Sequence, residues 1–172
     1  MLDYRMPLFD RYDMSVEFDM HIADSRKVIR SDRHRFSSLS DDDLIEFFCC
    51  EIACLELFPD EARMSVHEDS GNGWIELAVP FRGDASLWNL YPVEPISGLL
   101  GEVFRGHLLL QALGDNSEVA EAIFKVELEE ISQVIEQQCQ RVETFASAVP
   151  SIILSEARRI RYSEAPGIRT FH

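Results

Sequence analysis

The chain has 172 residues, 46% of them hydrophobic and 10% aromatic, and its formal net charge is −15. This length predicts a single globular domain covering residues 1–172, and the composition excludes a disordered chain. The negative charge disfavours direct binding to nucleic acid or to an anionic membrane, and it favours a basic protein as partner.

The negative charge is concentrated in one part of the sequence. Residues 37–147 contain 22 Asp and Glu but 5 Lys and Arg, whereas residues 1–36 contain 7 of each. No apolar run approaches the roughly 20 residues that span a bilayer. Three of the four cysteines, at 49, 50 and 54, crowd one apolar segment, which is a poor disulfide framework. We therefore expect a cytoplasmic protein with no membrane contact.

The first 60 residues predict one strand and one helix. Apolar and polar residues alternate over 15–22, which indicates a half-buried strand, and the basic, polar residues 24–36 predict a loop or arm. Ser40 is a good helix N-cap, and the three aspartates that follow favour a first turn. We expect this helix to run from 41 to about 58, because Pro59 follows.

The middle of the chain predicts β-structure. Residues 62–67 and 74–81 form the arms of a hairpin around the turn residues 69–73, and 87–91 is a further strand. With the strand at 15–22, these segments predict an α+β fold. The sheet is small and mostly antiparallel, and it is covered by one N-terminal helix and a C-terminal set of helices.

From Pro95 onward the apolar period becomes helical. We expect a helix over 96–113, a long helix from 117 to about 149, a short one over 151–161, and a loose tail from about 163. In the long helix, Val119, Ile123 and Val126 share a face rotated by over ~90° from the later apolar stripe. Either the helix breaks near residue 127, or its halves pack against different partners. An uncovered apolar stripe is an association surface, so we expect a homodimer through the helix near 117–149.

Few residues suggest catalytic or metal chemistry. Cys50 and Cys54 lie four apart on a predicted helix and could place two thiolates on one metal, but no nearby His completes a set, and we expect reduced, structural thiols. His67 precedes two carboxylates, as a general base or a metal ligand would, and a solvated hairpin end is the interpretation we favour. The sequence has no GxSxG, HExxH or P-loop pattern. We predict no catalytic residue, no metal and no cofactor.

A further pattern runs from Asn72 to Asp115. An Asn-Gly-aromatic strand is followed by a proline turn with Gly-Asp, a Trp, and a helix that begins near a Gly and ends in Gly-Asp. The residues concerned are Asn72-Gly73-Trp74, Pro80, Gly83-Asp84, Trp88, Gly98, Phe104 and Gly114-Asp115. This pattern resembles antirestriction proteins of the ArdB/KlcA type. The resemblance implies a non-enzymatic role in blocking type I restriction. The family's upstream Gly-Gly-Tyr-Trp strand is absent here.

The leading functional hypothesis is a non-enzymatic, acidic cytoplasmic module that binds a basic protein, as an inhibitor, an immunity protein or an antirestriction-like protein would. The carboxylates predicted to contact the partner are Asp41, Asp42, Asp43, Glu46, Glu127, Glu129, Glu130 and Glu136. One alternative is an enzyme or small-ligand-binding protein with a dispersed site, whose pocket is lined by Trp74, Trp88, Tyr91 and His67. The other is a structural homodimer.

Overall fold

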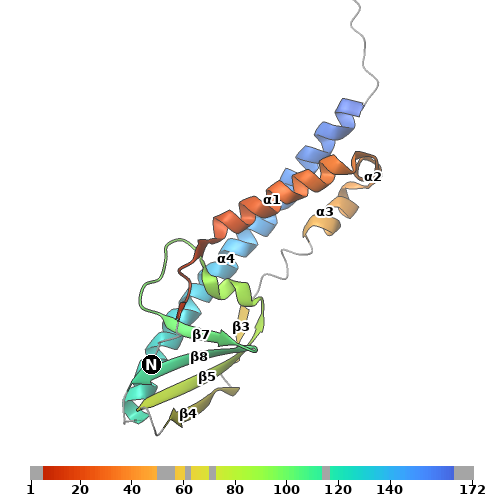
Figure 1. Cartoon of the computed structure of the whole chain (residues 1–172). Coiled ribbons are helices and arrows are strands. Elements are labelled where there is room, and N and C mark those ends of the chain that lie inside the picture. Colours follow the sequence, from red (N-terminus) through yellow and green to blue (C-terminus); the bar gives the residue numbers. More distant parts are fainter. Residues whose placement is uncertain (1–5, 50–56, 61–62, 70–72, 114–116, 165–172) are drawn as a thin grey trace, which may run out of the picture. The chain divides into compact units, whose positions relative to one another are not determined.

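The computed structural model describes residues 6–49, 57–60, 63–69, 73–113 and 117–164 (Figure 1). The α+β class predicted from the sequence is confirmed, with an antiparallel sheet and a long C-terminal helix. The chain divides into two compact units. We call residues 1–14 and 54–141 the sheet unit, and residues 15–53 and 142–172 the helical unit.

The sheet unit is built on six antiparallel strands in the order β1-β7-β8-β5-β3, with β4 also paired to β5. Their bounds are β1 Met6–Pro7, β3 Leu57–Pro59, β4 Ser65–Asp69, β5 Trp74–Gly83, β7 Leu100–Phe104 and β8 His107–Leu113. A short parallel pair joins β2 (Tyr12–Asp13) to β6 (Leu90–Tyr91), which follows the 3-10 helix η3 (Ala85–Asn89). The predicted hairpin over 62–81 is confirmed by β4 and β5, whereas the strand predicted over 87–91 is a 3-10 turn followed by two strand residues.

The helix predicted over 96–113 is wrong, because this segment forms the hairpin of β7 and β8. Its turn consists of Arg105 and Gly106, whose φ angles are 48° and 78°. Positive φ at both central residues is the type I′ turn that matches the twist of a two-residue hairpin. The run Leu108-Leu109-Leu110 fits a helical period as well as an alternating one, so the apolar pattern alone did not exclude a helix.

One face of the sheet forms the core of this unit. Alternate residues of β5 and β8 are buried, namely Ile75, Leu77, Val79, Leu108 and Leu110. Helix α4 (Ser117–Glu164) contributes Phe124 and Ile131, which are 3% and 1% exposed. Figure 1 shows the first turns of α4 running behind the strands.

The helical unit contains α1 (Met14–Ser31), α2 (Arg33–Ser38), α3 (Asp41–Cys49) and the last part of α4. The strand predicted over 15–22 is therefore wrong. The buried residues of α1 are Met14, Phe18, Ile22, Ser25 and Ile29, whose spacing of three or four is that of a helix. The arm predicted over 24–36 is wrong as well, because α1 and α2 cover most of it.

Helix α3 begins as the sequence predicted. The hydroxyl of Ser40 accepts a hydrogen bond from the backbone N–H of Asp43 at 3.1 Å, and the Asp43 carboxylate accepts one from the backbone N–H of Ser40 at 3.3 Å. This reciprocal pair is a capping box with Asp in the place of Glu. The predicted helical end at 58 is wrong, since Leu57 and Phe58 belong to β3, and residues 50–56 lie outside the described ranges.

Helix α4 continues through residue 127 and through Pro150. The predicted helix end before Pro150 is wrong. A proline inside a helix costs about 3 kcal/mol or more, but Val149 and Ile153 on either side of it are completely buried, so packing in the helical unit offsets this cost.

The residues of the predicted loose tail beyond Glu164 lie outside the described ranges. Among the described helices, none is both long and apolar enough to cross a membrane.

Candidate functional site

A groove of about 680 Å³ lies in the sheet unit, between β4, β5 and the first turns of α4. Its apolar lining consists of Met64, Val66, Leu77, Phe124 and Leu128. Its polar lining consists of Glu121, Lys125, Glu129 and Ser132, all from α4. The groove therefore has an apolar floor and a largely acidic rim on the helix side.

The helix side of the groove is a single face of α4. Its lining residues span 121 to 132 and recur every three or four positions, which places them on one side of a helix. Eleven residues of rise correspond to about 16 Å, or three turns. Phe124 is buried, whereas Lys125 and Glu129 on the same face are exposed. The face thus extends from the core into open space beside the sheet.

The other side of the groove is an edge strand. Within the described residues β4 pairs only with β5, so its outer edge is open. Val66 faces the groove and is 51% exposed. Open strand edges present unpaired N–H and C=O groups, which natural proteins either protect or use for binding.

The sheet unit also carries most of the negative charge. Its residues include 19 Asp and Glu and 7 Lys and Arg, a net charge of −12, whereas the helical unit has 12 and 9, a net of −3. The groove is also negatively charged, because Glu121 and Glu129 flank the single cation Lys125 in its described lining. A cationic ligand is therefore favoured over an anionic one.

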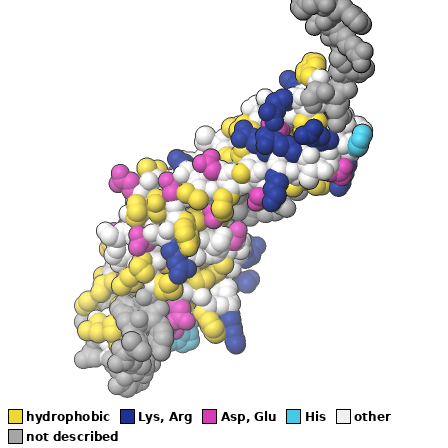
Figure 2. All heavy atoms as spheres, turned by 45° about the horizontal axis from the view of Figure 1, so that its top comes forward, with side chains coloured by type: hydrophobic (Ala, Val, Ile, Leu, Met, Phe, Trp, Pro, Cys, Tyr) yellow, Lys and Arg dark blue, Asp and Glu magenta, His cyan; other side chains and the backbone are white. Residues whose placement is uncertain are grey.

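In the helical unit, two carboxylates are held by arginines. Asp41 accepts hydrogen bonds from Arg161 at 2.8 Å and from Arg158 at 3.3 Å. The hydrogen bond from Arg161, followed by that from Arg158, lowers the pKa of Asp41. Figure 2 shows Lys and Arg side chains gathered on the helical unit. Asp41 is thus part of an internal ion-pair network, and a partner would compete with its arginines.

The second carboxylate is Glu156, which is 8% exposed. It accepts hydrogen bonds from Arg30 at 2.7 Å and from Arg159 at 2.8 Å, and the bond from Arg30 is the largest cause of its lowered pKa. A buried carboxylate needs such partners, because an uncompensated buried charge is strongly destabilising. This network joins α1 to the end of α4 within the helical unit.

The eight predicted contact carboxylates lie in both units. Asp41 is paired as described, Asp42 is exposed, and Asp43 and Glu46 line a groove between α1 and α3. On α4, Glu129 lines the sheet-unit groove, Glu130 and Glu136 are exposed elsewhere, and Glu127 is half-buried. Sequence reasoning missed Glu121, although its distance of eight residues from Glu129 places both on one helix face.

The four residues of the alternative pocket are dispersed. Trp88 is 1% exposed and packs against Phe9 and Phe81, with ring centroids 5.4 Å and 5.5 Å away. Tyr91 is half-buried on β6, and Trp74 is half-buried on β5. His67 is exposed on β4, where its Nε2 lies 3.1 Å from the hydroxyl of Ser65. None of the four lines the grooves described here.

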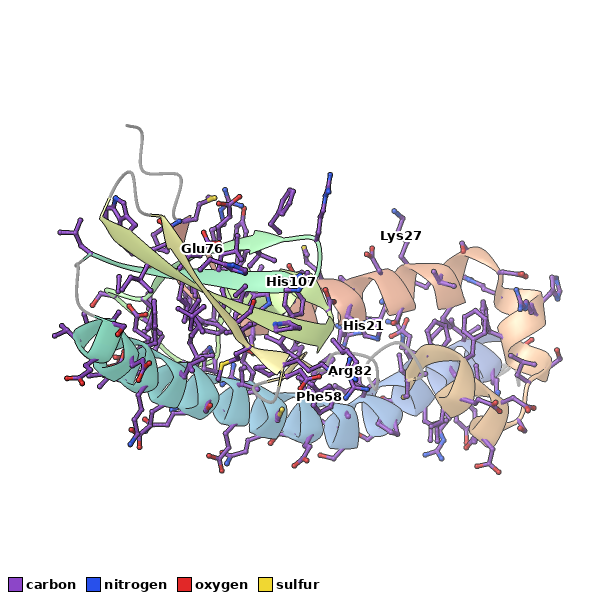
Figure 3. All side chains as sticks on the ribbon, turned by 90° about the horizontal axis from the view of Figure 1, so that it is seen from below. His21, Lys27, Phe58, Glu76, Arg82 and His107 are labelled. Atoms are coloured by element: carbon purple, nitrogen blue, oxygen red, sulfur yellow. The ribbon has the colours of Figure 1, made fainter. Side chains whose placement is uncertain are left out.

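The outer face of the sheet carries polar side chains. His67 lies opposite Glu76, which accepts a hydrogen bond from Gln111 at 3.1 Å. His107 is on the same face and is exposed (Figure 3). Cys49 and Cys139 are half-buried thiols, and Cys50 and Cys54 lie outside the described residues. Within the described ranges, no group of three His, Cys, Asp or Glu side chains is placed to hold a metal ion.

No protein-family model, curated protein or solved structure matches this chain. The resemblance of residues 72–115 to antirestriction proteins therefore stays a prediction. One structural expectation attached to it is wrong, since β7 and β8 occupy the place of the helix between Gly98 and Gly114.

Proposed function

We propose that the protein is a non-enzymatic binding module of the cytoplasm, and that its sheet-unit groove binds a basic, amphipathic segment of another protein. The observation that carries the proposal is the combination, in one groove, of an apolar floor with an acidic rim. Apolar side chains of the partner would occupy the space over Leu77 and Leu128, and its Lys or Arg side chains would meet Glu121 and Glu129. An antirestriction-like inhibitor would be one member of this class.

The size of the groove fits a short segment of the partner protein better than a broad, flat surface of that partner. The helix side of about three turns matches a short amphipathic helix with anchors at i, i+3 or i+4, and i+7. Buried apolar anchors supply most of the affinity at such sites, whereas charges at the rim mainly raise the association rate. We therefore expect substitutions in the floor to accelerate dissociation and reversals at the rim to slow association.

A second copy of the chain is a separate candidate partner at another surface. Val119, Ile123 and Val126 form a stripe on α4 that is 52%, 38% and 56% exposed. This stripe favours the homodimer expected from the sequence.

The groove proposal can be tested with a labelled model peptide of about 12 residues that carries leucines on one helical face and lysines elsewhere. We expect saturable binding by fluorescence anisotropy, weakened at least tenfold by Leu128→Asp and slowed by the double reversal Glu121→Lys, Glu129→Lys. A photo-crosslinking residue at Val66, introduced in the source cells, should then capture partners whose crosslinked segment is basic and apolar.

Glu130→Lys with Glu136→Lys is the matched control, because it makes the same charge change on exposed positions of α4 outside the groove. If both double reversals weaken binding equally, the peptide senses only the diffuse negative field and the groove proposal is wrong. Thermal melts of each variant separate loss of binding from loss of folding.

A further inference from the structure

Two rows of side chains run along the α4 side of the sheet-unit groove. Phe124 and Leu128 form an apolar row, and Glu121, Lys125 and Glu129 form a charged row beside it. Neighbours within each row are four residues apart, so each row is one ridge of the helix, with a rise of about 6 Å from one side chain to the next. The groove therefore presents a fixed series of charges, negative, positive and negative, beside its apolar floor.

The three charges of this row are available to a partner. All three side chains are exposed, and among the described residues none of them forms an ion pair, with one another or with a different element. Asp41 and Glu156 differ in this respect, because arginines of the helical unit already hold their carboxylates. A ligand of the charged row would have no internal ion pair to break.

Lys125 lies in the middle of the row, between the two glutamates. A segment with Lys or Arg at every polar position would place one of these cations next to Lys125, and like charges held close together oppose binding. A segment with a carboxylate at that point would instead gain an attraction there, while its flanking cations meet Glu121 and Glu129. The Lys125 side chain thus discriminates among basic segments.

We propose, on the basis of the function proposed above, that the partner segment is an amphipathic helix with a defined series of charges. One acidic residue lies opposite Lys125, a basic residue follows one turn away on either side, and apolar side chains form the adjacent row. Residues i, i+4 and i+8 of a helix that lies nearly along α4 reproduce the spacing of about 6 Å. The series is the same from either end, so the charges determine the register of the partner helix and not its direction.

The test compares two labelled peptides of about 12 residues that have the same composition and net charge. The matched peptide has Lys, Glu and Lys at i, i+4 and i+8 beside a row of leucines. In the shifted peptide the Glu is exchanged with a Lys of the opposite face, so three lysines line the leucine row. By fluorescence anisotropy with the full chain, we expect the matched peptide to bind about fivefold more tightly. Its helical circular dichroism should increase on binding.

Substitutions at Lys125 show whether this side chain recognises the series. Lys125→Gln should reduce the preference for the matched peptide, and Lys125→Glu should reverse it, so that the shifted peptide binds more tightly. Gln137→Glu is the matched control, because it makes the same change in net charge as Lys125→Gln at an exposed position of α4 outside the groove. It should leave the ratio of the two affinities unchanged, and thermal melts establish that each variant is folded.

Equal affinity of the two peptides for the wild type, or an unchanged preference in Lys125→Glu, would overturn this inference. A gain of strand signal on binding would also overturn it, because the peptide would then lie along the edge of β4 that is open among the described residues. Self-association of the wild type that Leu128→Asp abolishes would make a second copy the occupant instead.

The same measurements separate this inference from the function on which it rests. If both peptides bind equally and Leu128→Asp weakens both, the groove still binds a basic, amphipathic segment and only the charge series is wrong. If neither peptide binds saturably, both proposals fail.

Discussion

Gln138 connects helix α4 to the segment around η3 inside the sheet unit. It is 2% exposed, and its side-chain amide donates to the carbonyl oxygens of Leu87 and Leu90 at 2.8 Å and 2.6 Å. We expect Gln138→Leu to lower the free energy of unfolding by roughly 1–3 kcal/mol, because the Leu90 carbonyl loses the amide donor, whereas the Leu87 carbonyl still accepts from the backbone N–H of Leu90. Chemical denaturation measures this, and Gln137→Leu, at an exposed neighbouring position, should change stability by less than about 0.5 kcal/mol.

The arginine-held carboxylates of the helical unit make stability depend on pH. The pKa values of Glu156 and Asp41 are lowered by their hydrogen bonds to arginine. A carboxylate with a lower pKa in the folded state stabilises the fold above its unfolded pKa of about 4, and this stabilisation is lost as the pH falls through the folded value. We expect Glu156→Gln to destabilise the protein at neutral pH. The same change should reduce the pH dependence of the melting temperature between about pH 6 and pH 3. Glu143→Gln, at an exposed position of the same helix, should leave the pH dependence of the melting temperature unchanged.

At the scale of elements, the type I′ turn of β7 and β8 depends on Gly106. A Cβ at this position would meet no other atom within 4 Å, so the cost of a side chain is conformational rather than steric. With φ at +78°, Gly106→Ala should destabilise the protein by about 1 kcal/mol, and Gly106→Asn by less, because Asn tolerates the left-handed region. Equal melting temperatures for wild type and Gly106→Ala would contradict the turn assignment.

Elements were predictable where local chemistry is unambiguous. The cap at Ser40 and the hairpin of β4 and β5 follow from short-range signals, as does a helix beginning at 117. The first part of helix α1 was predicted as a strand because the spacing of Phe18 and Ile22 fits both a helical and an alternating period. The burial of Ser25 and Ile29 further along the chain shows that the period is helical. The groove could be predicted only in part, since β4 and α4 meet through tertiary packing that no local pattern encodes.

At the scale of the whole molecule, the charge asymmetry and the exposed stripe of α4 both bear on association. The sequence predicted the stripe correctly: Val119 and Val126 are more than half exposed, whereas Ile131 is buried. We expect a dimer at high micromolar concentration by sedimentation equilibrium, converted to a monomer by Val119→Lys with Val126→Lys. Val93→Lys is the control, since Val93 is 62% exposed but lies outside α4. A wild-type monomer at that concentration would rule the dimer out.

Neither unit is continuous in the sequence, and this has a consequence for synthesis on the ribosome. The sheet is complete by Leu113, but the helix that buries its apolar face begins at Ser117, and β1 must pair with a strand more than 90 residues later. The helical unit forms later still, because Arg30 can pair with Glu156 only after residue 156 has been synthesised. A nascent chain stalled near residue 113 would therefore present an uncovered apolar sheet and bind folding chaperones, and extension beyond residue 141 would release them.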